Sequence, residues 1–341
     1  MRLFVSIICS WMYAGIVMLR TFAYRIGLLP VHRLTVPVIC VGNITAGGTG
    51  KTPAVIALSR MLDTMHKKHA VLTRGYGRKG KGMIMVSDGG VHRASHDTAG
   101  DEAFMMATLL PTVPIIADSN RPHGASWILD HFGKRIILMD DGFQHFALYR
   151  DLNICVIDAH DPWGGGHMLP RGLLREPKKA VTRAHLIMLT HCEMCSRECI
   201  NRLSDEIIAM HQVPIIETVH APIGLTNICT GVRHDCSWIH DRDIVAVSGI
   251  GNHRSFASTV ESCGGRIART FRFPDHYPYT VKEFQDIVAY GRRTGHPIIT
   301  TAKDAARICS VMRKTENAYV LDIELRIVRG EDILENRLAR L

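Results

Sequence analysis

The sequence has no low-complexity tract and no internal repeat, and only 21% of its residues are charged whereas 46% are hydrophobic. A chain of this composition can bury a core, which excludes intrinsic disorder. Ten cysteines in 341 residues are too few for a small secreted scaffold held by disulfides. The length is sufficient for two domains, because single cores stop growing at roughly 250–300 residues.

One cysteine-rich segment departs from this sparse pattern. The segment "HCEMCSREC" brings Cys192, Cys195 and Cys199 close together, a spacing also found in zinc and iron–sulfur sites. The sequence has no second cysteine pair at a matching distance, and the segment is typical of a helix that begins after a strand. We therefore favour reduced cytosolic thiols without a metal.

The charge is unbalanced, with 41 Lys and Arg against 32 Asp and Glu, a formal net charge of +9. This balance favours acidic partners, namely phosphorylated ligands, nucleic acid or an anionic membrane. The sequence lacks an interleaved aromatic and basic patch and a recognisable nucleic-acid reader motif. We therefore expect no nucleic-acid partner.

The N-terminus carries no charged residue between Arg2 and Arg20. That run is at the lower limit for a membrane-spanning helix, which needs about 17–25 apolar residues. No small-residue cleavage site of a secretory signal follows. A buried helix, a short span and a helix in the membrane interface all remain open. Membrane contact is favoured by aromatic side chains and by a basic edge after the run, which suit an anionic bilayer surface: Trp11, Tyr13, Tyr24, Arg20, Arg25 and Arg33.

The segment "VGNITAGGTGKTP" lies between an apolar run, "VPVICVGN", and a segment with helical apolar spacing, "AVIALSRMLDTM". A strand, a glycine-rich turn and a helix are the context in which a phosphate-binding loop works. Lys51 would reach the β and γ phosphates, and the Thr52 hydroxyl would hold Mg²⁺. Thr45 stands where the usual spacing has the outermost glycine. The residues expected to bind the nucleotide are Thr45, Gly47, Gly48, Thr49, Gly50, Lys51 and Thr52.

Two aspartates end a second apolar run, in "RIILMDDGFQH". An acidic residue at a strand tip beside a phosphate loop holds Mg²⁺ or its water shell. Asp140 and Asp141 would repel each other in a dry site unless a cation lies between them. The sequence therefore predicts a magnesium site here.

Two further segments carry candidate proton-transfer groups. In "TAGDEAFMMA", Asp101 and Glu102 lead an amphipathic helix, where carboxylates are also favoured simply as a helix start. In "RFPDHYPYT", Asp275 and His276 are neighbours that can orient one another for proton transfer, although 19 histidines make chance pairs common. The residues alone are compatible with a structural and with a catalytic role in both segments.

Apolar runs and helical stretches alternate along the chain, which predicts an α/β fold with a mainly parallel sheet and helices on both faces, of the P-loop NTPase type. The pattern restarts near residue 240 with "DIVAVSGIGN". We expect an N-terminal membrane-associated helix over residues 1–35, a P-loop kinase domain over 36–225, and a smaller α/β domain over 226–341.

Taken together, these motifs resemble the tetraacyldisaccharide 4'-kinase family of lipid A assembly in Gram-negative bacteria. The resemblance rests on "VGNITAGGTGKTP", "TRGYGR", "GDEAFM", "DDGFQH", "REP", "FPDHYPY" and "TAKDAAR", which follow the family's order from about residue 37 to about residue 307. The threonine at position 45 is part of that family's pattern. Arg171 in "MLPRGLL" departs from it, since the family usually has a small residue there.

The resemblance implies transfer of the γ-phosphate of ATP to the 4'-hydroxyl of a tetraacylated glucosamine disaccharide 1-phosphate. It implies that Asp101 is the base, assisted by His276, in an enzyme with two α/β/α domains at the cytoplasmic face of the inner membrane. Family metal-site and active-site positions are matched by Glu102, Asp140, Asp141, Gln144 and His145. Further active-site candidates are Tyr76, Arg175 and Asp275, and candidate clamps for the acceptor's 1-phosphate are Arg78, Arg121 and Arg171.

A membrane-recruited P-loop ATPase that acts as a switch or positioning factor is the alternative. It would share the basic surface, the N-terminal helix and the phosphate loop. It needs no carboxylate base aimed at an acceptor, and it hydrolyses ATP with water.

Overall fold

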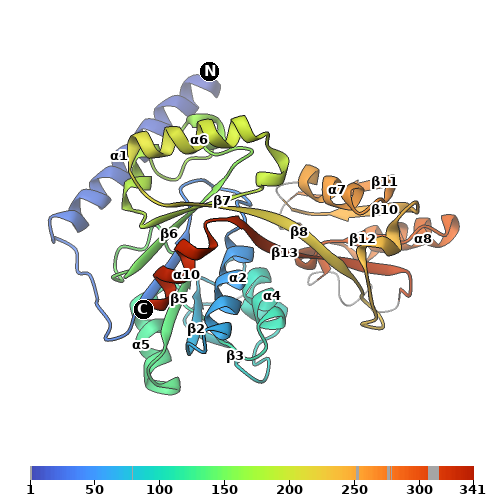
Figure 1. Ribbon diagram of the computed structural model, residues 1–341, viewed down its shortest axis with the longest axis horizontal. Coiled ribbons are helices and arrows are strands. Elements are labelled where there is room, and N and C mark those ends of the chain that lie inside the picture. Colours follow the sequence, from blue (N-terminus) through green and yellow to red (C-terminus); the bar gives the residue numbers. More distant parts are fainter. Residues whose placement is uncertain (1, 79, 251–252, 275–276, 278, 306–314) are drawn as a thin grey trace.

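The structure is a computed structural model that describes residues 2–78, 80–250, 253–274, 277, 279–305 and 315–341, and it has a larger and a smaller lobe (Figure 1). Its strands are β1 (Val38–Gly42), β2 (His69–Thr73), β3 (Ile84–Asp88), β4 (Pro114–Ala117), β5 (Ile136–Asp140), β6 (Leu152–Asp158), β7 (Leu186–Thr190), β8 (Ile215–Asn227), β9 (Arg233–His234), β10 (Asp243–Ser248), β11 (Arg266–Arg272), β12 (Ile298–Thr300) and β13 (Ala318–Arg329). Its helices are α1 (Arg2–Arg25), α2 (Lys51–Thr64), α3 (His96–Ala99), α4 (Asp101–Leu109), α5 (Arg121–Phe132), α6 (Arg197–Met210), α7 (His253–Ser262), α8 (Val281–Thr294) and α10 (Glu331–Ala339), with short helical turns η1 (Gly164–Gly166), η2 (Lys178–Arg183), η3 (Cys192–Met194) and η4 (Cys236–Ile239).

All 13 strands of the described chain belong to one sheet, in the order β11-β10-β12-β13-β8-β7-β6-β1-β5-β2-β4-β3, with β9 paired to β8. Neighbours are parallel except at the pairs β3–β4, β8–β9 and β8–β13. This arrangement confirms the predicted α/β fold with a mainly parallel sheet. Every residue of β1, β2, β5 and β7 is buried, as expected of strands covered by helices on both faces.

Two long antiparallel strands link the lobes. In Figure 1, β8 and β13 run side by side from the larger lobe into the smaller one, and their register extends from Tyr319 opposite Asn227 to Arg329 opposite Glu217. The smaller lobe contains β10, β11 and β12 with α7 and α8. Helix α8 begins with a capping box between Thr280 and Glu283.

The C-terminal helix α10 returns to the larger lobe. Figure 1 shows α10 in the larger lobe near α2. Leu334 and Leu338 are fully buried in the same core cluster as Leu58 and Leu62 of α2. The predicted boundary after residue 225 falls inside β8, and the last residues pack with the first lobe. Hydrophobic burial therefore brings the chain end back to the larger lobe, and the division at residue 225 stays a prediction.

Candidate active site

The phosphate loop connects β1 to α2 and is braced from both sides. The Asn43 side-chain amide donates to the Thr49 hydroxyl at 2.8 Å, and the Thr190 hydroxyl donates to the Thr49 carbonyl at 2.9 Å. Gly50 caps α2 with a φ of 81°, a left-handed conformation that glycine adopts at little cost. The loop therefore delivers backbone N–H groups to the start of a helix, which is an anion site.

The entry of the loop explains the threonine at position 45. Thr45 is buried and pairs with Leu174 in a β-bridge, while the Ala46 amide donates to the Leu173 carbonyl at 2.7 Å. The Arg175 amide donates to the Ile44 carbonyl at 2.7 Å. A β-branched residue suits this extended pairing, so a glycine is not needed here.

Asp140 and Asp141 lie at the end of β5, which pairs directly with β1. Asp140 is buried, and its Oδ2 accepts a hydrogen bond of 2.9 Å from the Thr73 hydroxyl. Its Oδ1 is buried with no hydrogen-bond partner among the described residues. Burial, together with the negative charges of Glu102 and Asp141, raises the pKa of Asp140 to about 7.

Asp141 is held between two cations. Lys51 Nζ lies 3.7 Å from Asp141 Oδ1, and the Arg175 guanidinium donates to both carboxylate oxygens at 3.0 and 3.1 Å. Burial alone would raise the pKa of Asp141, but the charges of Lys51 and Arg175 outweigh it and hold the pKa below its usual value. Asp141 is therefore ionised beside the phosphate loop.

The start of α4 lies where the two lobes meet. Glu102 Oε1 is 3.8 Å from Lys303 Nζ, which follows β12 in the smaller lobe. Asp101 occupies the first helical position, after Gly100. A Cβ on Gly100 would lie 2.5 Å from the Tyr76 carbonyl oxygen, so this close approach joins "GDE" to "RGYGR".

Lys303 is a site residue that sequence reasoning missed. It belongs to the segment "TAKDAAR", in which the sequence alone indicates no role for the lysine. The sequence feature that could have indicated Lys303 is a lysine soon after a short apolar run, where a strand is expected to end. Only the pairing of the two lobes shows that it faces Glu102.

The candidate arginine clamps differ in burial. Arg171 is exposed, and Arg78 is partly buried with its guanidinium donating to the carbonyls of Ala117 and Gly82. Arg121 is fully buried, and it donates to the carbonyls of Asp118 and Asp140, the latter at 3.0 Å. The Arg121 guanidinium thus links two strand ends, and its contact with the acceptor's phosphate stays a prediction.

The segment after the two aspartates is anchored to the loop entry. The Gln144 amide donates to the Asn43 carbonyl and to Glu176 Oε1, both at 2.8 Å. His145 is partly buried, and burial, reinforced by the positive charges of Arg121 and others, lowers its pKa to about 4. The Gln144 side chain thus lies at the entry of the phosphate loop, and the lowered pKa keeps His145 neutral near pH 7.

Tyr76 is exposed near the start of α4. Asp275 and His276 lie outside the described residues. Cys192 is buried, Cys195 is half-buried and Cys199 is exposed.

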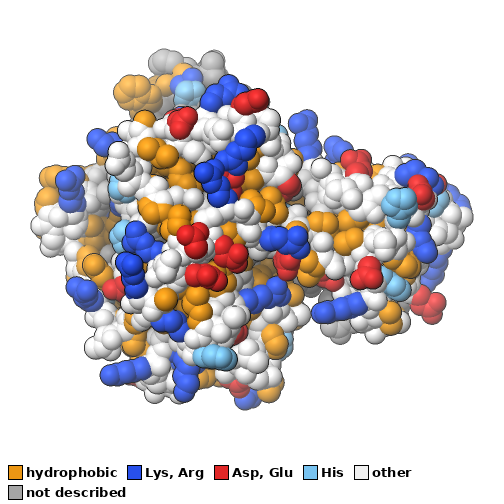
Figure 2. Space-filling view, viewed as in Figure 1, with side chains coloured by type: hydrophobic (Ala, Val, Ile, Leu, Met, Phe, Trp, Pro, Cys, Tyr) orange, Lys and Arg blue, Asp and Glu red, His pale blue; other side chains and the backbone are white. Residues whose placement is uncertain are grey.

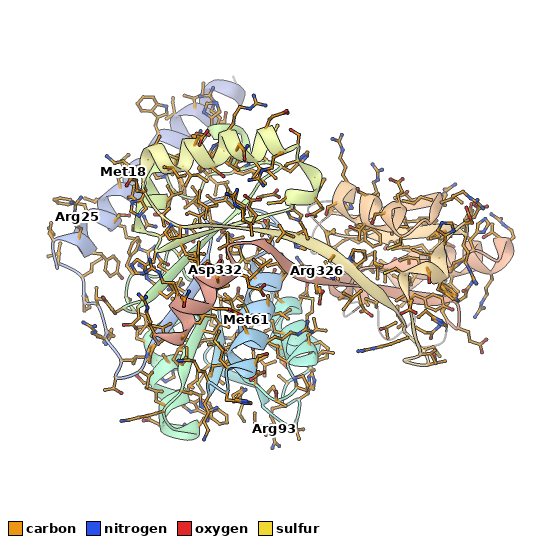
Figure 3. All side chains as sticks on the ribbon, viewed as in Figure 1. Met18, Arg25, Met61, Arg93, Arg326 and Asp332 are labelled. Carbon is orange, nitrogen blue, oxygen red and sulfur yellow. The ribbon has the colours of Figure 1, made fainter. Side chains whose placement is uncertain are left out.

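A cavity of about 1200 Å³ opens between the phosphate loop and the smaller lobe. Its walls include the phosphate loop from Gly47 to Pro53, Glu102 and Lys303. Met61 of α2 and Arg326 of β13 also line it, and Figure 3 shows them on neighbouring elements where the lobes meet. The cavity is large enough for a nucleotide together with part of a second substrate.

The residues fit a magnesium ion that is held in part by phosphate. The donors are all oxygens, from the Thr52 hydroxyl and the carboxylates of Glu102, Asp140 and Asp141, which is the set that Mg²⁺ prefers. The orphaned Oδ1 of Asp140 and its raised pKa both indicate a missing positive charge. Within the described chain no three His, Cys, Asp or Glu side chains form a complete metal cluster. Mg²⁺ commonly uses one or two carboxylates plus substrate phosphates.

Helix α1 presents apolar side chains to solvent. A segment from Val5 to Arg25 is long and apolar enough to cross a membrane, and 6% of its most apolar window is buried. The alternative of a core helix is therefore wrong. The helix contacts the body of the protein through the Ser10 hydroxyl, which donates to the Met168 carbonyl at 2.9 Å, and through Tyr24, which stacks on Phe146. Figure 2 shows Lys and Arg spread over both lobes of the face that it draws.

Comparisons with known proteins agree with this geometry. A relative from Halothermothrix orenii named tetraacyldisaccharide 4'-kinase is 35% identical, with 98% of this chain and 91% of the relative covered. A second, from Elusimicrobium minutum, is 36% identical over 90% of this chain and 83% of the relative. The solved LpxK of Aquifex aeolicus in complex with ATP is 30% identical and matches with a TM-score of 0.79 over 100% of this chain and 99% of that one. A model of the tetraacyldisaccharide-1-P 4'-kinase family matches residues 3–341, and the chain belongs to that family of kinases.

Proposed function

We propose that the protein transfers the γ-phosphate of Mg-ATP to the 4'-hydroxyl of tetraacyldisaccharide 1-phosphate in lipid A biosynthesis. The observation that carries the proposal is the single cavity shared by the phosphate loop, Glu102 of α4 and Lys303 of the smaller lobe. The A. aeolicus relative solved with ATP supports ATP as the donor. The family description supports the acceptor.

Each loop residue has a role in this reaction. The backbone amides between Gly47 and Thr52 would hold phosphate oxygens, and Lys51 would offset charge on the γ-phosphate. Mg²⁺, when bound by Thr52, Glu102, Asp140 and Asp141, supplies charge neutralisation at the β and γ phosphates. Arg175 keeps Asp141 ionised and in place.

The acceptor side rests on α4 and the arginines. Asp101 would accept the proton of the 4'-hydroxyl while the oxygen attacks the γ-phosphate, and His276 would assist it. Arg78 and Arg171 would contact the acceptor's 1-phosphate. A base at the first turn of α4 lies beside Glu102, at the edge of the cavity that the nucleotide would fill.

The lipid acceptor accounts for the N-terminal helix. An acceptor with four acyl chains resides in a bilayer, and α1 exposes apolar side chains that suit the membrane interface. We place the protein at the cytoplasmic face of the bacterial inner membrane, held there by α1.

Acceptor dependence separates this proposal from an ATPase switch. ADP formation from Mg-ATP is measured in detergent with and without tetraacyldisaccharide 1-phosphate. A kinase forms ADP only with the lipid, whereas a switch forms it at the same rate without the lipid.

Variants then test the base. Asp101→Asn should lower turnover by about 10²–10⁴-fold, the usual contribution of a general base, with Mg-ATP affinity kept. Lys51→Ala should lower both the turnover and the affinity for Mg-ATP. Near-normal turnover in Asp101→Asn would remove it from the mechanism.

A further inference from the structure

Two buried histidines are stacked beside the phosphate loop. His191 follows β7 and His220 lies on β8, and their ring centroids are 4.3 Å apart at an interplanar angle of 23°. They are 5% and 7% exposed, and both line the cavity that contains the loop. The mechanism above uses neither of them.

The His220 ring abuts the last glycine of the loop. A Cβ on Gly50 would lie 3.3 Å from His220 Cε1 and 3.4 Å from Nε2, and 3.2 Å from Thr190 Cγ2. Gly50 is also the N-cap of α2, where the helix begins to offer its amides. A shift of the His220 ring therefore changes the space available to the phosphate loop.

The Nδ1 atom of each imidazole faces a carboxylate. Asp158 Oδ2 from the end of β6 is 3.0 Å from His191 Nδ1, and Glu193 Oε1 from η3 is 3.7 Å from His220 Nδ1. Glu193 also accepts a hydrogen bond of 3.2 Å from the His220 backbone amide. Neither Nδ1 makes a hydrogen bond of good geometry to the described residues.

Burial and the positive charge that His191 can carry disfavour protonation of His220, whereas the carboxylates of Glu193 and Asp158 favour it. Burial lowers the pKa of His220, against the opposing charge of Glu193. Burial would raise the pKa of Asp158 and of Glu193, but the neighbouring imidazoles hold both below their usual values. The other ionisable groups on this turn are the buried Cys192 thiol and the half-buried Cys195 thiol, and Lys51 follows Gly50 on the loop.

The chemistry of imidazole defines what protonation would do. A neutral ring has one donor and one acceptor nitrogen, whereas an imidazolium has two donors. With the proton on the Nδ1 that faces a carboxylate, Nε2 of neutral His220 presents a lone pair near the loop. A phosphate repels that lone pair but accepts a hydrogen bond from a protonated Nε2.

We propose that His220, supported by the His191 ring and the carboxylates of Asp158 and Glu193, is a positioning residue of the phosphate loop that takes up one proton when nucleotide phosphates bind. This inference rests on the proposed use of Mg-ATP. The proton comes from solvent to Nε2 of His220, and no covalent bond changes. Nucleotide affinity then increases as the pH falls.

The test measures Mg-ATP affinity without lipid by calorimetry between about pH 6 and about pH 8.5, where histidine titrates. The wild-type affinity should rise on acidification by up to about tenfold per pH unit, the limit for uptake of one proton. His220→Gln should weaken binding and remove that part of the slope. Comparison with wild type cancels ionisation of the nucleotide itself. Titrations in two buffers of different ionisation enthalpy count the protons directly.

A matched control is His234→Gln, which changes a histidine of the same cavity that stacks on Trp238 in the smaller lobe. It should keep the wild-type slope. If His220→Gln does not fold, His191→Asn removes the stacked ring and should shift the midpoint of the pH dependence. A wild-type slope in His220→Gln, or an unmoved midpoint in His191→Asn, overturns the inference while the kinase proposal stands. Absence of Mg-ATP binding by the wild type at every pH overturns both.

Discussion

The exposed face of α1 allows a quantitative prediction of membrane affinity. Leu19 is 70% exposed and Phe22 is 57% exposed, although each is strongly apolar. Replacing both by serine leaves the larger lobe's core untouched, because neither side chain is buried in it. The double variant should fold as the wild type does and bind vesicles more weakly.

The magnitude follows from the area that a bilayer would cover. Fully burying a Leu or Phe side chain contributes about 1.5–3 kcal/mol. With more than half of each side chain exposed, insertion should contribute about 1–2 kcal/mol per residue, and about 2–4 kcal/mol for the pair. At 1.4 kcal/mol per factor of ten, the partition constant should fall by roughly 30- to 1000-fold.

The assay is sedimentation with vesicles that contain anionic lipid, at fixed ionic strength. The control is Val232→Ser with Val281→Ser, two valines that are 52% and 58% exposed in the smaller lobe. That control should change binding by less than about threefold, since neither residue lies on α1. Equal losses in the two double variants, or no loss in the α1 variant, would refute the reasoning that α1 holds the protein on the membrane.

Three further predictions concern stability, measured by urea unfolding. Leu334→Ala should lower the free energy of unfolding by about 2–5 kcal/mol, because it opens a cavity in the core of the larger lobe. Replacement of the exposed Glu335 by alanine should hardly change it. Equal effects of the two variants would contradict the packing of α10. His145 has a folded-state pKa of about 4, below that of the unfolded chain, so the unfolded state binds the extra proton first. Its contribution is complete above about pH 6.5 and is lost as the pH falls through about 4, a loss of about 1–3 kcal/mol that His145→Gln should abolish. Arg175→Ala should lower the free energy of unfolding by about 1–2 kcal/mol, because Asp141 then keeps only Lys51 as a partner. Replacement of the exposed Lys179 by alanine should leave the free energy of unfolding unchanged. Equal effects of the two variants would contradict the role of the ion pair.

The parts of the site that are local in sequence could be predicted. The glycines before Lys51 and the aspartates at a strand end are required by the local backbone conformation and chemistry of a phosphate loop, which depend on only a few neighbouring residues. The sheet then brings them together because β1 and β5 are hydrogen-bonded neighbours. The strand–helix alternation predicted this parallel arrangement correctly.

The parts that depend on long-range packing could not be predicted. Arg121 has the guanidinium group that a phosphate clamp requires, but the burial of its side chain depends on how α5 packs at the end of β5. Lys303 meets Glu102 only because the lobes face each other. The packing of α10 against α2 could not be predicted either, because the apolar periodicity of a helix shows which face is buried but not which element covers it.

The most direct test of the kinase proposal is the fate of the γ-phosphate. Labelled Mg-ATP and tetraacyldisaccharide 1-phosphate are incubated with the protein in detergent, and the lipid product is analysed by mass and by phosphorus NMR. The proposal predicts a bisphosphorylated lipid whose new monoester is at the 4'-position, with one ADP formed per lipid. Labelled inorganic phosphate without labelled lipid would contradict it and would favour the ATPase switch.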